Sequence, residues 1–122
     1  MGENYVTRVE AQGSVSIAED VIATIAYEAA RSVDGVGGFS TSLGGKIADR
    51  LSERASVRGV KVFVEDNEVS IDLFFLVQYG AVILDVTKAV QETVASSMEA
   101  ITGLRVKQVN VTVCGVAFEK GK

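Results

Sequence analysis

The chain has 122 residues, a formal net charge of −4, 48% hydrophobic residues, one cysteine and no histidine. A chain of this length fits one domain, which buries roughly two thirds of the surface that its unfolded form exposes. The lack of histidine excludes serine–histidine and cysteine–histidine catalysis and most zinc sites, and the single Cys114 excludes an internal disulfide. The acidic balance argues against nucleic-acid binding.

No stretch reaches the ~18 consecutive apolar residues that span a bilayer, and Met1–Glu10 has no apolar run of signal-peptide length. Cys114 is expected to be an unreactive core residue in a reducing compartment. We therefore expect a soluble cytoplasmic protein, with residues 1–12 as an N-terminal tail, 13–118 as a single domain and 119–122 as a C-terminal tail.

The first predicted helix begins with the capping-box pattern Ser16-Ile17-Ala18-Glu19 and ends at Asp34-Gly35. Between them, apolar residues recur at three-and-four spacing and predict a core-facing stripe. They are Val21, Ile22, Ile25, Ala26, Ala29, Ala30 and Val33. A short strand is expected at 36–39, followed by a glycine- and serine-rich loop.

The next segment, Leu43 to Arg58, has the pattern of a basic amphipathic helix. Residues 46–61 carry five basic and two acidic side chains, a net +3, so the other segments carry −7. Three interpretations stay open: a surface helix over the core, a contact for an anionic membrane surface or acidic partner, and disorder. The basic row consists of Lys46, Arg50, Arg54 and Arg58, beside an apolar row of Leu43, Ile47, Leu51 and Ala55.

Residues 60–77 predict a β-hairpin with Asp66-Asn67 as its two-residue turn. The register then pairs Val64 with Val69, Val62 with Ile71, Val60 with Leu73 and Lys61 with Asp72. With the aliphatic pairs toward the helices, three large apolar side chains point to the opposite face: Phe63, Phe74 and Leu76. Such a face is either an interaction surface or covered by the connector at 40–58.

A second helix is expected from Val82 to Ile101, ended by Thr102-Gly103, with Tyr79 anchoring the turn that precedes it. Its predicted core face consists of Val86, Ala89, Val90, Val94, Met98 and Ile101. In the last strand Val109, Val111 and Val113 alternate inward, and a bulge near Cys114-Gly115 would bring Val116 and Phe118 into the same alternation.

This order of elements predicts an α+β fold, with two helices on one face of a mainly antiparallel or mixed sheet. It is ferredoxin-like in element order, with an insertion at 40–58. The glycine-rich stretch before Lys46 is not a phosphate-binding loop, because Ser40 and Ile47 stand where that loop has glycine and a hydroxyl residue. No catalytic, cofactor or metal site and no small-molecule substrate are expected.

Several short motifs, in their order and spacing, resemble the bacterial alkaline shock (Asp/Gls-type) envelope stress response family over residues 13–118. They include Gly13-Ser14-Val15-Ser16-Ile17, Val77-Gln78-Tyr79-Gly80, Ile101-Thr102-Gly103-Leu104 and Val109-Asn110-Val111. The chain departs from the family at Ile83-Leu84-Asp85, where Ile-Pro-Glu is common, and at Ile101, where methionine is usual.

The resemblance implies a non-enzymatic cytoplasmic factor of cell-envelope homeostasis and stress, and some members are held near the membrane by integral-membrane partners. The first hypothesis is therefore a module that self-associates or docks to a protein partner, which can be membrane-anchored. The second is a regulatory adaptor of a metabolic enzyme, such as one of lipid synthesis. The third is a cryptic enzyme, which a deep pocket with strongly perturbed acids would favour.

If the basic row contacts anionic surfaces, reversing Arg50 and Arg54 to glutamate should weaken binding to anionic liposomes. The effect should be larger at low salt, because exposed charges are screened over about 10 Å at 0.1 M. Liposome co-sedimentation measures it, and wild-type protein that ignores such liposomes at low salt would contradict it.

Overall fold

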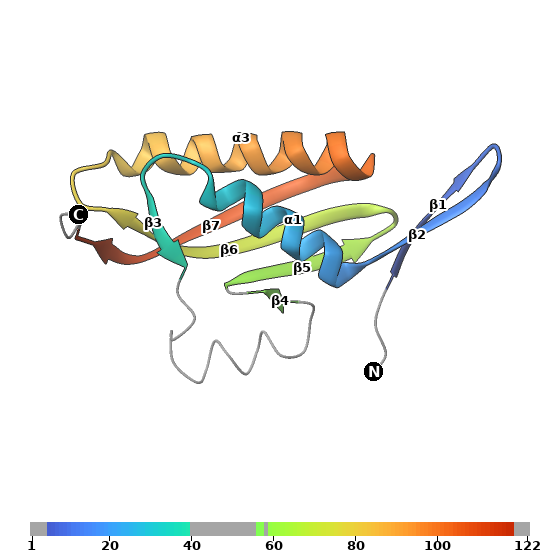
Figure 1. The fold of residues 1–122 in the computed structure, drawn as a ribbon, viewed down its shortest axis with the longest axis horizontal. Coiled ribbons are helices and arrows are strands. Elements are labelled where there is room, and N and C mark those ends of the chain that lie inside the picture. The colour runs from blue at the N-terminus through green and yellow to red at the C-terminus, as the bar shows by residue number, and fades with distance from the viewer. Residues whose placement is uncertain (1–4, 40–55, 58, 119–122) are drawn as a thin grey trace.

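The computed structural model describes residues 5–39, 56–57 and 59–118. Figure 1 shows helices α1 (Glu19–Arg31) and α3 (Ile83–Thr102) packed beside a five-stranded sheet, with a separate two-stranded hairpin projecting at one end. The hairpin consists of β1 (Tyr5–Glu10) and β2 (Gly13–Ala18). The sheet consists of β3 (Val36–Phe39), β4 (Ser56–Val57), β5 (Val60–Glu65), β6 (Glu68–Gln78) and β7 (Arg105–Ala117).

Strand β6 is the centre of the sheet. Strand β7 pairs with it in parallel along its whole length, whereas β5 and then β3 pair antiparallel along the other edge, and β4 extends the sheet beyond β5. The predicted hairpin register is confirmed, including Val64 opposite Val69 and Lys61 opposite Asp72. Asp66 and Asn67 have φ angles of 53° and 66°, as a two-residue turn with both central residues left-handed requires.

The α+β class and the element order are confirmed, but the strand pairing departs from a ferredoxin-like sheet. In that arrangement the strand before the first helix is part of the main sheet. Here β2 pairs with β1 instead. The reason is that β7 takes one edge of β6 and β5 with β3 takes the other, so β6 has no free edge for β2.

The start of the chain also differs from the predicted tail at 1–12, since Tyr5–Glu10 forms β1 and buries Val6 to 2% exposure. Pairing with β1 extends β2 as far as Ala18, so the predicted capping box is wrong. The Ser16 hydroxyl lies 2.9 Å from the Thr7 hydroxyl across the hairpin, and α1 begins after Ala18 without a side-chain cap. The tail predicted at 119–122 lies outside the described residues.

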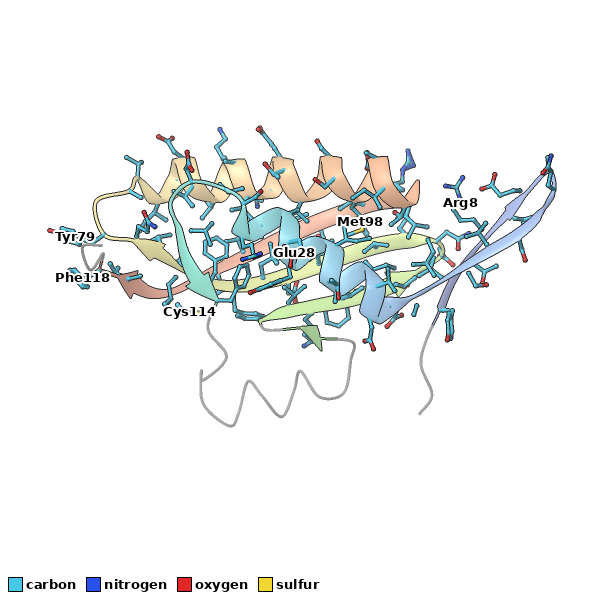
Figure 2. All side chains as sticks on the ribbon, viewed as in Figure 1. Arg8, Glu28, Tyr79, Met98, Cys114 and Phe118 are labelled. Atoms are coloured by element: carbon cyan, nitrogen blue, oxygen red, sulfur yellow. The ribbon has the colours of Figure 1, made fainter. Side chains whose placement is uncertain are left out.

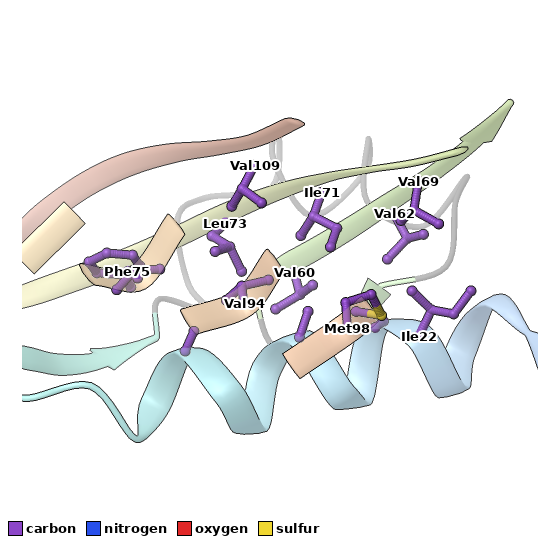
Figure 3. Close-up of a cluster of buried hydrophobic side chains, with 14 of the residues drawn as sticks. Ile22, Val60, Val62, Val69, Ile71, Leu73, Phe75, Val94, Met98 and Val109 are labelled. Carbon is purple, nitrogen blue, oxygen red and sulfur yellow. The ribbon is translucent and has the colours of Figure 1, made fainter. Parts of the chain in front are cut away.

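The core lies between the sheet and the two helices (Figure 3). Inward residues of β5 and β6 meet a row at four-residue spacing on α3, and α1 contributes Ile22 and three alanines. The fully buried members include Val60, Val62, Val69, Ile71, Leu73, Phe75, Val90, Val94 and Met98. The helix faces are therefore predicted well from periodicity alone.

Two residues predicted on these faces are exposed: Val21 by 48% and Ile101 by 65%. Val21 lies on the flank of α1, because Ile22 and Ala26 occupy the row that faces the sheet. At the end of α3, Gly103 adopts φ 75° and turns the chain so that Leu104, only 2% exposed, takes the place expected for Ile101. A left-handed glycine with an apolar residue after it is a common helix ending.

The predicted bulge in β7 is confirmed. Phe75 pairs with Val113 but Leu76 pairs with Gly115, so Cys114 is the extra residue. After the bulge, Val116 pairs with Val77 and returns to the parity of the helix-facing side chains.

The hairpin is tied to the body at the C-terminal end of α3, which has no basic residue of its own in the last turn. The Arg8 guanidinium supplies one, with Nη1 3.5 Å from the Thr102 carbonyl oxygen and Nη2 3.2 Å from a Glu10 carboxylate oxygen. A positive charge at the C-terminal end of a helix interacts favourably with the helix dipole. Gly103 leaves room for it, since a Cβ there would collide with the guanidinium.

We predict that Gly103→Ala lowers the free energy of unfolding by about 1–2 kcal/mol, because alanine is strained at positive φ. Urea unfolding followed by circular dichroism measures this. In an Arg8→Ala background the loss should be smaller, since the collision with the guanidinium is removed. An unchanged unfolding midpoint in the single variant would contradict the prediction.

Candidate interaction surface

The face of the sheet away from the helices carries the three residues that the sequence singled out, and we call it the open face. Phe63, Phe74 and Leu76 are each half-buried, whereas their neighbours Phe75 and Val77 are at most 2% exposed toward the helices. Their predicted direction is therefore confirmed. Both helices pack on the opposite side of the sheet, and most of the connector at 40–58, the other cover expected for the open face, lies outside the described residues.

The three residues do not form one continuous patch. Phe63 pairs with Ser70, and Phe74 lies four residues further along β6, roughly 13 Å at the rise of a strand. Lys61 and Asp72 lie between them. The apolar part of the open face is therefore centred on Phe74 and Leu76.

Lys61 and Asp72 are cross-strand neighbours, as expected, but these two opposite charges do not form an ion pair with each other. The Lys61 ammonium lies 4.9 Å from the centroid of the Phe63 ring, and Asp72 accepts a hydrogen bond of 2.9 Å from the Asn110 side-chain amide. Asn110 lies beside Asp72 because β7 pairs in parallel with β6, an interaction that the hairpin alone could not reveal. Polar groups thus bound the Phe74–Leu76 region at one end.

Strand β7 contributes small residues beside Leu76. Gly115 is paired with Leu76, and a Cβ at Gly115 would lie 3.1 Å from the Leu76 side chain. Glycine therefore allows the leucine side chain to lie across the neighbouring strand.

A second apolar surface was not predicted from the sequence. Six large apolar side chains gather where β6 leads into α3 and where β7 ends, and we call them the end patch. They are Tyr79, Val82, Ile83, Leu84, Val116 and Phe118, with exposures of 71%, 60%, 49%, 60%, 46% and 67%. The uncharged run Ala81-Val82-Ile83-Leu84 before the helix is the sequence signal that could have found it.

Contacts between β6 and β7 hold the end patch together. The Tyr79 and Phe118 rings stack with centroids 5.0 Å apart, and the Tyr79 amide donates a hydrogen bond of 2.8 Å to the Ala117 carbonyl. Figure 2 shows both rings at the end of the molecule opposite Arg8. Tyr79 therefore anchors the turn, as expected, and also belongs to an exposed apolar surface.

The basic row Lys46, Arg50, Arg54 and Arg58 lies outside the described residues. Where the predicted helix overlaps the described part, it is wrong: Ser56 and Val57 form β4 and pair with Lys61 and Val60. Gly59, at φ 89°, turns the chain back from β4 into β5, and this pairing replaces helix at the end of the segment.

Chemistry at the described residues is limited. In residues 5–39, 56–57 and 59–118, no three histidine, cysteine or acidic side chains are placed to hold a metal ion. No helix in the same ranges is long and apolar enough to cross a membrane. At the β7 bulge, the Cys114 sulfur lies 3.8 Å from the Thr112 carbonyl oxygen, and burial raises the pKa of the thiol.

Comparison with known proteins places the sequence of this chain in a family. Residues 7–118 match the model of the alkaline shock protein 23 family, which is described as having a cell envelope-related function. The chain is 32% identical to the uncharacterized protein YqhY of Bacillus subtilis, over 88% of this chain and 79% of that protein. It is 34% identical to the uncharacterized protein YloU of the same organism, over 85% of this chain and 88% of that protein.

A streptococcal relative gives a similar match. The chain is 31% identical to the uncharacterized protein Spy1614 of Streptococcus pyogenes, over 83% of this chain and 85% of that protein. No solved structure matches the chain.

The raised pKa of Cys114 leads to a prediction about its reactivity. A higher pKa leaves less thiolate at a given pH, and thiolate is the reactive form. At about pH 7.5, iodoacetamide should therefore alkylate Cys114 more slowly in the folded chain than in the urea-unfolded chain. Mass spectrometry over time measures the two rates, and faster alkylation of the folded protein would point to an activated thiol.

Proposed function

The chain belongs to the alkaline shock protein 23 family, and we propose that it serves that family's cell envelope-related function as a non-catalytic interaction module. It acts within the cell-envelope stress response, in the cytoplasm, by self-association or by docking to a partner protein. A partner anchored in the membrane would bring it to the envelope periphery, since no helix of the described part could span a bilayer.

The observation that carries this proposal is the one-sided packing of the sheet. Both helices cover one face, while Phe74 and Leu76 are half-buried on the other. Apolar groups rimmed by polar ones are a recurrent mark of protein interfaces. Here the rim includes Asp72, Asn110 and Lys61.

The composition of the chain supports a role without catalysis or nucleic acid. Histidine is absent, and the net charge of −4 is of the same sign as nucleic acid. The interior between sheet and helices is filled with apolar side chains. We therefore propose a protein partner and no small-molecule substrate.

Replacing Phe74 by serine should reduce self-association or partner binding and leave the chain folded, because the side chain is only half-buried. Size-exclusion chromatography with light scattering measures assembly, and circular dichroism measures folding. Crosslinking followed by pull-down from cells measures partner binding.

The matched control is Val9→Ser, which changes an apolar residue that is 85% exposed on the hairpin, away from the open face. It should leave assembly unchanged. A folded Phe74→Ser variant with unchanged assembly and partner binding would rule out the open face, and an unfolded variant would show that Phe74 is core. Specific recovery of a metabolic enzyme would favour the adaptor role over envelope assembly.

A further inference from the structure

The end patch is a larger exposure of apolar surface than the open face. Its six large side chains are 46% to 71% exposed, while the open-face residues are half-buried. At about 100 Å² of exposed surface for each side chain, the patch covers on the order of 600 Å². That is at the upper limit of patches on ordinary monomers.

The size of the patch suits a contact between two copies of the chain. Two such patches facing each other would bury on the order of 1,200 Å², which reaches the lower limit of specific protein interfaces. None of the six residues of the patch carries a charge, so their side chains in one copy can meet those of the other without burying a charge of their own.

The charged residues beside the patch also favour a second copy of the chain as its partner. Asp85 and Lys88 are both exposed and lie three residues apart on α3, next to Leu84. The ion pairs within the described ranges are Arg8–Glu10 and Arg31–Glu28, so those ranges hold no ion pair of Asp85 or Lys88. In a two-fold contact each residue meets its counterpart reciprocally, so antiparallel α3 helices can place Asp85 opposite Lys88 of the second copy, twice.

We propose that the end patch forms a two-fold contact between two copies of this chain, with Leu84 in the apolar centre and Asp85–Lys88 pairs at the rim. This goes beyond the proposed function, because the contact lies at the end of the sheet and leaves the open face available to a partner.

The apolar centre is tested with Leu84→Ser. Sedimentation or light scattering over a concentration series should show a dimer of the wild-type chain, and a dissociation constant at least about tenfold higher for the variant. Leu84 is 60% exposed, so the variant should stay folded. The matched control is Ile101→Ser at the other end of α3, 65% exposed, which should leave the dissociation constant unchanged.

The rim is tested by charge reversal. Asp85→Lys alone and Lys88→Asp alone should each weaken the dimer, because each places like charges opposite each other. An equimolar mixture of the two variants should dimerise like wild type, since a mixed pair restores both attractions. The measurements are made at about 50 mM salt, where screening is weak.

Three results would overturn the proposal: a wild-type chain that is monomeric at every concentration, a dimer that folded Leu84→Ser does not weaken, or a mixture no better than its components. A wild-type chain that stays monomeric and binds zwitterionic vesicles through the end patch would also overturn the proposal, because the occupant of the patch would then be a lipid surface. Loss of the dimer in Phe74→Ser but not in Leu84→Ser would place self-association on the open face instead, overturning this contact and supporting the proposed function.

Discussion

The alternation of side chains along β6 is the constraint on which the rest of the structure depends. Successive residues from Val69 to Val77 are buried against the helices or half-buried on the open face, without a break. Because the period of a strand is two, a slip of one residue would exchange the two faces completely. The Asp66-Asn67 turn fixes the register at one end of β6, and the bulge at Cys114 lets β7 follow it to the other. The helices then have one apolar face on which to pack, and the residues left over define the open face.

Local patterns predict much of this arrangement, and long-range pairing accounts for what they miss. The hairpin follows from alternation and turn chemistry, and the bulge follows from the change in parity between Val113 and Val116. Strand β1 is not predicted from the sequence pattern, because it carries a single buried side chain, Val6. The capping-box prediction is wrong because pairing with β1, which the pattern does not reveal, holds Ser16 in a strand. The error at Ile101 arises from Gly103, whose left-handed turn ends the periodicity and brings Leu104 to the core.

The interaction surfaces also divide into a part that local patterns predict and a part that depends on long-range pairing. The direction of Phe63, Phe74 and Leu76 follows from the register, and so does the separation of Phe63 from the other two. The end patch could not be predicted as a unit, because Tyr79 and Phe118 are brought together by the parallel pairing of β6 with β7. Membership of the alkaline shock family accounts for the envelope-related role. Family membership does not identify the surface that makes the interaction. That surface depends on the exposure and charge of particular residues.

The parallel pairing of β6 with β7 also affects how the chain is made. Strand β5 reaches β6 through a two-residue turn, so this edge can close as soon as both strands leave the ribosome. The opposite edge of β6 must wait until α3 and then Arg105–Ala117 have been synthesised. During that interval an 11-residue strand, apolar along its whole helix-facing side and at Phe74 and Leu76 on the other side, has an unpaired edge. Exposed strand edges of this kind recruit other chains. Nascent and C-terminally truncated forms of the protein are therefore the species most exposed to aggregation.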